Sequence, residues 1–325
     1  MLFVCKTDAK PCFNAIRHKT EKKGSLSALK RTGIKKQIAV LLAAALALAL
    51  LAACGSPFAR VPAATVDPYA GMVQVESGFG TKMWVQRHEE LAESAFLGWS
   101  RLQSVPAGYT VEMGVDVSEH QGEIYWRAVK KEHIDFAILR AGYRGYGEAG
   151  RLVEDACFRD NLSGALAAGI PVGIYFFSQA VTPEEAEEEA DFLLEMLKDV
   201  PQKDIALPVF FDWEDISHDT ARTDGLDGET ITACAIAFCE RVAAAGYTPG
   251  LYAYRYLAYF NYDLPRLSDY ALWVGALGAE SDFYYAHEFW QNAVTDGISG
   301  INGEVDRNFR FVKLPEPVQT DEAEA

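Results

Sequence analysis

Short apolar runs alternate with amphipathic stretches between residues 111 and about 311. The runs typical of strands are 113–118, 136–141, 171–177, 208–214 and 250–254. The stretches typical of helices are 125–132, 156–168, 183–197 and 229–245. Near-continuous apolar strands separated by helices predict a parallel sheet that is covered on both faces, either closed or open.

The strand–helix rhythm changes after residue 254. Strand-like runs continue at 272–275, 288–291 and 304–307, but full helical stretches no longer separate them. We therefore predict an α/β fold, an irregular (β/α) barrel of about eight strands that resembles a TIM barrel and whose last three units lack full helices. This barrel is expected to occupy residues 111–313.

Three further regions flank the predicted barrel. Residues 72–76 and 81–85 alternate around a Ser-Gly-Phe-Gly turn, and 87–102 has a helical pattern, so 69–110 is expected to form a small hairpin/helix region. Residues 54–68 are rich in Pro and Ala and have the composition of a tether. The acidic, Pro-containing residues 314–325 are expected to be disordered.

Charge divides the chain at residue 54. The formal net charge is −16, yet residues 1–53 hold ten of the 30 Lys and Arg and only two of the 46 Asp and Glu, which leaves 20 bases against 44 acids in the remainder. A body with this excess of acids offers no basic surface for nucleic acid. The basic start and the sixteen apolar residues 38–53 are typical of an export signal, and the run is short of a membrane span.

Cys54 directly follows the predicted export signal. The sequence Leu51-Ala52-Ala53-Cys54-Gly55 resembles the bacterial lipobox, in which the cysteine carries lipid and becomes the mature N-terminus. We expect 1–53 to be removed and Cys54 to tie the protein to the cell membrane on its extracytoplasmic side. The alternative is an uncleaved anchor helix, which gives the same location.

The other cysteines point away from cross-links and metal. Apart from Cys5 and Cys12 in the signal, there remain Cys157, Cys234 and Cys239, an odd number that excludes complete pairing. We interpret all three as small buried side chains. The six His and the Cys show no zinc-ligand spacing, so neither a metal nor a cofactor is expected.

Acidic residues stand at the predicted strand ends, where barrels of this class carry their function. Asp116 ends the first strand, Asp212 and Glu214 end the fourth, and Asp306 lies on the last. Side chains alternate along a strand, so Asp212 and Glu214 face the same side about 6.6 Å apart, while Trp213 faces the other side and is expected to pack. Such paired carboxyls suit glycoside hydrolysis.

Repulsion between these neighbouring carboxylates is expected to determine which of them keeps a proton. Crowding by Asp116, Asp212 and Asp306 is expected to raise the pKa of Glu214, so that it keeps a proton for the leaving oxygen. The ionised neighbours would stabilise the positive charge that develops on the sugar.

With these motifs in view, the chain resembles the family-25 glycoside hydrolases, the lysozyme-type N-acetylmuramidases of the cellosyl or Chalaropsis type. The resemblance spans about 200 residues and rests on six segments in order. They are Gly114-Val-Asp-Val-Ser-Glu-His-Gln-Gly122, Phe136-Ala-Ile-Leu-Arg-Ala-Gly142, Gly173-Ile-Tyr-Phe-Phe177, Phe211-Asp-Trp-Glu214, Phe289-Trp-Gln291 and Gly303-Glu-Val-Asp-Arg-Asn308. The resemblance implies cleavage of the β-1,4 bond between N-acetylmuramic acid and N-acetylglucosamine in peptidoglycan, with Glu214 as general acid.

The role of Asp212 stays open between nucleophile and a carboxylate that assists the substrate's acetamido group, and we favour assistance. Phe176 departs from the family, many of whose members have His at this place; Phe cannot donate a hydrogen bond, so a contact to substrate or to the residues around the site is expected to be missing there. Further residues are expected to contact substrate: Tyr175, Tyr252, Tyr254 and Trp290 by stacking or else as packing, Gln291 and Asn308 by hydrogen bonds, and Arg140 as a partner of the acids or in a structural ion pair.

Two rival interpretations remain. The same fold would serve a non-catalytic peptidoglycan-binding lipoprotein, although the four intact acids argue against loss of catalysis. The enzyme class would also serve another substrate, such as a chitin-like polymer. We expect a monomer whose partners are peptidoglycan glycan strands and, through Cys54, the membrane.

Overall fold

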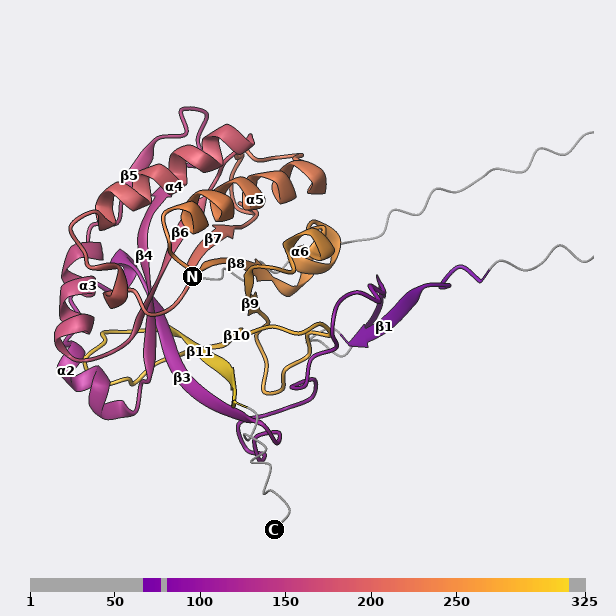
Figure 1. The fold of residues 1–325 in the computed structure, drawn as a ribbon, viewed down its shortest axis with the longest axis horizontal. Helices are drawn as coiled ribbons and strands as arrows, with labels where there is room; N and C mark the ends of the chain where they lie inside the picture. The colour runs from indigo at the N-terminus through magenta and orange to yellow at the C-terminus, as the bar shows by residue number, and fades with distance from the viewer. Residues whose placement is uncertain (1–66, 77–80, 316–325) are drawn as a thin grey trace, which may run out of the picture. The chain divides into compact units, whose positions relative to one another are not determined.

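The computed structural model describes residues 67–76 and 81–315 (Figure 1). The expected signal, nearly all of the expected tether with Cys54, and the tail after Pro315 lie outside the described residues. Within the described ranges, no helix is both long and apolar enough to cross a membrane.

Eight strands close into a barrel, which confirms the predicted fold. They are β3 (Tyr109–Val117), β4 (Phe136–Arg144), β6 (Val172–Ser178), β7 (Val209–Trp213), β8 (Pro249–Tyr254), β9 (Ala271–Gly275), β10 (Phe289–Thr295) and β11 (Val305–Lys313). Their order is β3-β11-β10-β9-β8-β7-β6-β4, and pairing of β3 with β4 closes the ring. Strand β5 (Leu152–Glu154) adds to the edge of β4 in antiparallel pairing.

The direction of β11 differs from that of the other barrel strands. Seven strands run parallel, but β11 pairs antiparallel with both β10 and β3. The connection from β10 to β11 is the loop 296–304, which is shorter than the crossover that a parallel neighbour requires. The expected repetition of parallel strands is therefore wrong for the last strand.

Helices cover the first part of the barrel, as the periodicity predicts. They are α2 (Trp126–Val129), α3 (Phe158–Ala167), α4 (Pro183–Leu197) and α5 (Gly228–Ala244), and a short α6 (Arg255–Phe260) follows β8. Single 3₁₀ turns lie at η1 (Glu119–Gln121), η2 (Lys130–Glu132), η3 (Gln202–Asp204) and η4 (Leu264–Leu267). Thr182 caps α4 and Asp227 caps α5, each accepting a hydrogen bond from the backbone N–H three residues ahead.

The core has two layers. The larger layer lies between strands and helices, where the outward side chains of the strands, such as Phe211 and Trp213, are buried. The smaller layer fills the barrel interior and is largely aromatic: Phe136, Ile138, Leu207, Phe210, Tyr252, Trp273 and Phe289. This interior plug forms an apolar floor beneath the polar inward-facing residues at the carboxyl ends of the parallel strands.

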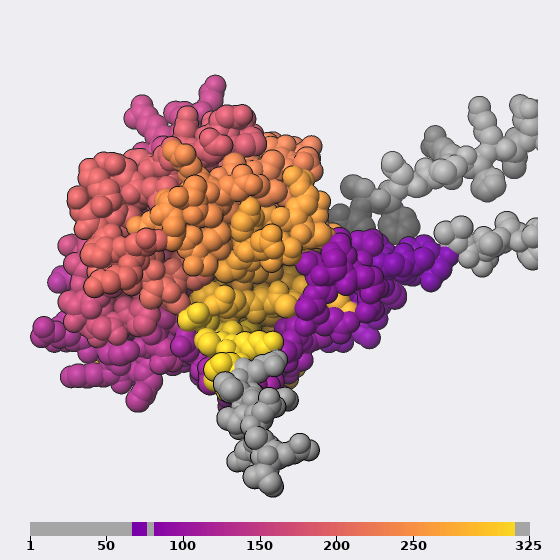
Figure 2. All heavy atoms as spheres, in the orientation of Figure 1, coloured from indigo at the N-terminus to yellow at the C-terminus, as the bar shows by residue number. Residues whose placement is uncertain are grey.

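The region before the barrel is only partly as expected. The hairpin is present as β1 (Met72–Glu76) and β2 (Lys82–Gln86). The helix expected at 87–102 is wrong, because this segment consists of turns and one isolated bridge, Glu93 to Tyr285. Figure 2 shows this indigo-to-purple segment lying against orange and yellow parts of the chain near its end.

Tertiary hydrogen bonds explain why the helix does not form. Backbone groups of residues 92–99 pair with the loop 276–288 between β9 and β10: Ser94 N–H donates to the Tyr284 carbonyl at 2.7 Å and Gly98 N–H to the Ser281 carbonyl at 2.7 Å. Groups bonded in this way cannot also form helical bonds. The non-helical segment 87–102 therefore covers the side of the barrel formed by its last strands, which are not followed by full helices.

Candidate active site

Four side-chain carboxyl groups meet at the open end of the barrel where the parallel strands terminate. Asp116 lies one residue before the end of β3, Asp212 one before the end of β7, and Glu214 directly after β7. Asp306 is the second residue of β11. Because β11 runs antiparallel, its beginning lies at this same opening, and Asp306 is the direct cross-strand partner of Asp116. The structure thus brings together the four acids that the sequence predicts.

Asp116 is buried and held by two amides. Its Oδ2 accepts hydrogen bonds from Gln291 Nε2 at 2.9 Å and from Asn308 Nδ2 at 2.8 Å. Burial, and then the nearby charge of Asp306, raise the pKa of Asp116 to about 8, although the two amide donors lower it. Asp116 is therefore a carboxyl whose position is fixed and which takes up a proton easily.

The two amides are themselves oriented by aromatic donors. Tyr252 donates from its hydroxyl to Gln291 Oε1 at 2.8 Å, and Trp273 donates from Nε1 to Asn308 Oδ1 at 2.9 Å. An indole N–H can only donate, so it fixes the amide oxygen of Asn308 on its own side and the NH₂ group on the side of Asp116. Gln291, Asn308 and Tyr252 thus support a carboxylate, and their contact with substrate stays a prediction.

Asp212 and Glu214 face inward from the same strand. Asp212 is buried, and its Oδ1 has no hydrogen-bond partner among the described residues. Burial, followed by the charges of Glu214 and Asp116, raises the pKa of Asp212. Burial and Asp306 raise the pKa of the half-buried Glu214 to about 7, so desolvation contributes more than the crowding expected from the sequence. Burial also raises the pKa of Asp306.

The backbone of Glu214 is anchored by a buried glutamine. Gln179, just after β6, donates from Nε2 to the Glu214 carbonyl at 3.0 Å, and its Oε1 accepts a hydrogen bond from the Thr223 hydroxyl at 2.9 Å. Its backbone N–H donates to Glu189 at 3.3 Å. Glu214 thus leaves the strand in a fixed direction although it lies outside the ladder.

Arg140 pairs with acids other than the four. Its Nε lies 2.7 Å from Asp155 Oδ2 and its Nη2 lies 3.0 Å from Glu119 Oε1. This ion pair is the structural alternative of the sequence analysis. The guanidinium still lies close enough to oppose the rise in the pKa of Asp212.

The expected cleft aromatics divide into two groups. Tyr175 and Tyr252 face the barrel interior with Trp273, at ring-centroid distances of 5.9 and 4.7 Å, and the half-buried Tyr254 ends β8. Trp290 was expected in the cleft but points outward, because its position on β10 alternates with the inward Gln291. It packs against Trp99 and Phe309 and donates from Nε1 to the Ala276 carbonyl at 2.8 Å.

Phe176 also points outward. It is fully buried and contacts Phe192 of α4 at a centroid distance of 6.2 Å. The departure from the family at this position therefore lies in the packing between sheet and helix, and the expectation of a missing substrate contact is wrong.

Two residues that support the site did not emerge from the sequence. Trp273 lies in a predicted strand, and alternation along that strand would have placed it inside the barrel with the neighbouring inward positions. Gln179 has no comparable signal, since a polar residue after a strand is ordinary. Among the described residues, no cluster of His, Cys, Asp and Glu is arranged to hold a metal ion, and Cys157, Cys234 and Cys239 are unpaired, with only Cys157 partly exposed.

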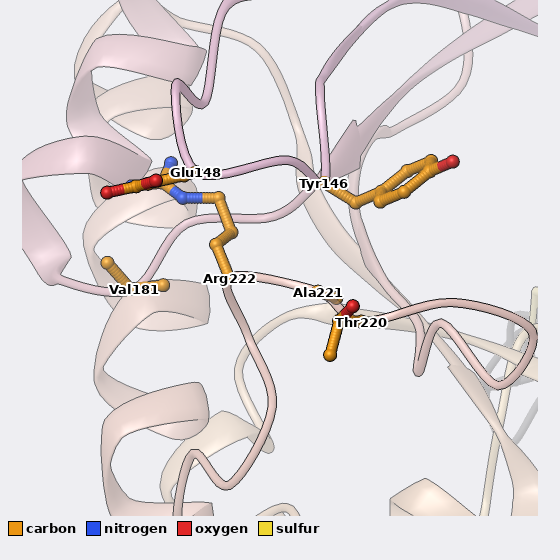
Figure 3. A pocket seen from close by; sticks show the side chains of 6 residues that line it. All are labelled: Tyr146, Glu148, Val181, Thr220, Ala221 and Arg222. Carbon is orange, nitrogen blue, oxygen red and sulfur yellow. The ribbon is translucent and has the colours of Figure 1, made fainter.

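A cavity of about 460 Å³ opens among loops of the chain (Figure 3). Three loops form it, and they follow β4, β6 and β7 at the same end of the barrel as Asp212 and Glu214. Its lining residues are Tyr146, Glu148, Val181, Thr220, Ala221 and Arg222.

Comparisons with known proteins agree with this geometry. The sequence profile of glycosyl hydrolases family 25 matches residues 115–301. Lysozyme M1 of Streptomyces globisporus is 26% identical over 307 residues, which cover 87% of this chain and 93% of that protein.

Solved structures share the fold. The modular autolysin LytC of Streptococcus pneumoniae superposes with a TM-score of 0.53 at 23% identity over 74% of this chain, which spans only 56% of the autolysin. The bacterial lysozyme of Streptomyces coelicolor gives a TM-score of 0.50 at 24% identity, covering 61% of this chain and 90% of that one.

Proposed function

The chain belongs to family 25 of the glycosyl hydrolases, and from that premise we propose that it is a muramidase. It hydrolyses the β-1,4 bond between N-acetylmuramic acid and N-acetylglucosamine in peptidoglycan. The observation that carries this proposal is the cluster of four inward carboxyls, in which Glu214 has a pKa of about 7 and can hold a proton at neutral pH.

Glu214 is the general acid. It donates its proton to the glycosidic oxygen as the bond from that oxygen to the anomeric carbon breaks, and as a carboxylate it then takes a proton from the incoming water. Gln179 holds the Glu214 backbone while this exchange occurs. Asp116 and Asp306 supply negative charge beside the oxocarbenium-like transition state when they are ionised.

Asp212 assists the acetamido group of the substrate. Its buried Oδ1 lacks a partner within residues 67–76 and 81–315, and a buried acceptor left unpaired costs about 1–3 kcal/mol. An acetamido N–H would satisfy this oxygen and thereby turn the acetamido carbonyl toward the anomeric carbon. Attack by Asp212 itself is the alternative, and an activated fluorosugar separates the two: a trapped sugar on Asp212 would contradict assistance.

Digestion of purified peptidoglycan tests the function. We expect products whose reducing ends are N-acetylmuramic acid, identified by mass spectrometry. Reducing ends of N-acetylglucosamine would contradict the bond assignment, and faster cleavage of chitin would point to the other substrate. Absence of turnover, together with equal glycan binding by wild type and Glu214→Gln, would favour a binding protein.

The location is proposed from the sequence alone. A lipid on Cys54 would hold the enzyme on the extracytoplasmic face of the bacterial membrane, within reach of the cell's own wall, and we propose that it acts there as a monomer. Fatty-acid labelling of the wild type that is lost in Cys54→Ala would support this location. Unchanged labelling would contradict it.

A further inference from the structure

The cavity of Figure 3 is connected to the active site through Gln179. This residue bonds the Glu214 carbonyl with one end of its amide and the Thr223 hydroxyl with the other. Thr223 directly follows Arg222 of the cavity wall, and Arg222 N–H donates to the Tyr146 carbonyl at 2.9 Å. The cavity wall therefore lies only a few side chains from the proton donor.

The cavity wall carries charges of both signs. Arg222 donates from Nη2 to Glu185 at 2.6 Å, while its Nε and Nη1 have no partner among the described residues. Gly150, at φ +48°, lets the guanidinium pack on bare backbone, since a Cβ there would lie 2.1 Å from Arg222 Nη1. Glu148 forms no ion pair in the part of the chain that the structure describes.

The remaining lining is small or amphipathic. Tyr146 is partly exposed and approaches the His218 ring edge-on at 6.0 Å, Thr220 adds a hydroxyl, and Val181 and Ala221 add apolar surface. A volume of about 460 Å³ falls in the range of small-ligand sites. The surface thus combines the carboxylate of Glu148, unpaired within the described ranges, with hydrogen-bonding hydroxyls and a little apolar area, beside a guanidinium that is already paired with Glu185.

We propose that this cavity binds the peptide branch of peptidoglycan and so makes peptide-bearing glycan the preferred substrate. This proposal rests on the proposed muramidase function. The N-acetylated glycan itself offers no positive charge for Glu148, with or without its peptides, whereas the peptide carries ammonium groups. Four extended residues reach about 14 Å, enough to bridge from the cleaved sugar to a neighbouring cavity.

The test compares two substrates for each enzyme. One is intact peptidoglycan, and the other is the same material after an amidase has removed its peptides. For Glu148→Gln we expect the ratio of kcat/KM values, intact over stripped, to fall about tenfold, as loss of one charge-assisted hydrogen bond implies. Ala221→Trp, which fills the cavity, is expected to lower the ratio at least as much.

Glu132→Gln is the matched control, because Glu132 is an exposed glutamate in η2 ahead of β4, at the opposite end of the barrel. Its ratio should equal that of the wild type. The inference is overturned if Glu148→Gln and Ala221→Trp also keep the wild-type ratio, or if they lose activity equally on both substrates.

Failure of the proposed muramidase function would be distinguishable from failure of the proposed peptide site. In that case the wild type would cleave neither substrate, and calorimetry with the peptides released by the amidase would decide the inference. Binding by wild type that weakens about tenfold in Glu148→Gln would support the cavity as a peptide site. Equal binding, or none, would overturn it.

Discussion

Asp306 and Asp116 lie directly opposite each other on the antiparallel strands β11 and β3. Directly opposed side chains are close neighbours, and like charges there are unfavourable. The charge of Asp306 accordingly raises the pKa of Asp116 after burial has done so. The antiparallel pairing of the first and last barrel strands is therefore also the place where protonation of two acids is coupled.

Replacing Glu214 by Gln should lower kcat on peptidoglycan about 10²- to 10⁴-fold, because the amide cannot donate a proton to the leaving oxygen. The wild-type kcat should fall as the pH rises above about 7, where Glu214 loses that proton. Turnover measured across pH checks both points. A rate that stays level from pH 6 to pH 9 would rule out Glu214 as the acid.

Asp116→Asn should stabilise the protein while damaging catalysis. The folded-state pKa of about 8 lies above the unfolded value of 3.8, so the folded state binds more protons between these pH values and stability is lost as the pH rises through that window. Asn removes this loss and can still accept from Asn308 and Gln291. We expect a gain of about 1–2 kcal/mol at pH 8, measured by denaturant unfolding.

The same substitution at Asp155 should have the opposite effect. Asp155 is a buried carboxylate paired with Arg140 at 2.7 Å, so Asp155→Asn leaves this buried cation with the more exposed Glu119 as its remaining acidic partner. Destabilisation by both Asp116→Asn and Asp155→Asn would contradict the difference drawn between the two sites.

Trp273→Phe should release the amide of Asn308. Without the indole donor, the Asn308 oxygen loses its partner and can turn toward Asp116, which costs about 1–3 kcal/mol of unfolding free energy. The pKa of Asp116 should then rise further, since the Asn308 hydrogen bond lowers it. Carboxyl NMR titration of Asp116 measures this shift.

Trp213→Phe is the control for that experiment, because Trp213 is a buried indole on the outer face of β7 whose Nε1 has no partner in the described part of the chain. It removes an indole N–H without loss of a hydrogen bond. An equal pKa shift of Asp116 in both variants would show that the relay through Asn308 is not the cause.

Phe176→His restores the residue found in many family members, yet it should not raise activity. The side chain packs on α4, away from the acids, and a buried imidazole without a partner should cost about 1–3 kcal/mol of stability. kcat and KM of the folded fraction should match those of the wild type. A severalfold gain in kcat would mean that position 176 communicates with the cleft.

The sequence allowed the barrel, its helices and its four acids to be predicted because each has a local signal. Thr182 and Pro183 mark the start of α4, and strand alternation places Asp212 and Glu214 on one face. The prediction that Trp290 lies in the cleft was wrong because alternation alone does not say which of Trp290 and Gln291 faces inward. The prediction of a helix at 87–102 was wrong because backbone N–H groups of this segment donate to carbonyls almost 190 residues later in the chain, at Ser281 and Tyr284.

The non-helical segment before the barrel bears on what counts as an independent folding unit. The family profile begins at residue 115 and ends at 301, yet β3 begins at Tyr109 and pairs with β11 as far as Lys313. Phe96 of the preceding segment stacks on Phe311 at 3.6 Å. The matched part of the chain therefore holds Asp116, Asp212 and Glu214 but stops before Asp306, whereas a self-sufficient polypeptide must also include β11 and the turns that shield the rear of β10 and β11 from water.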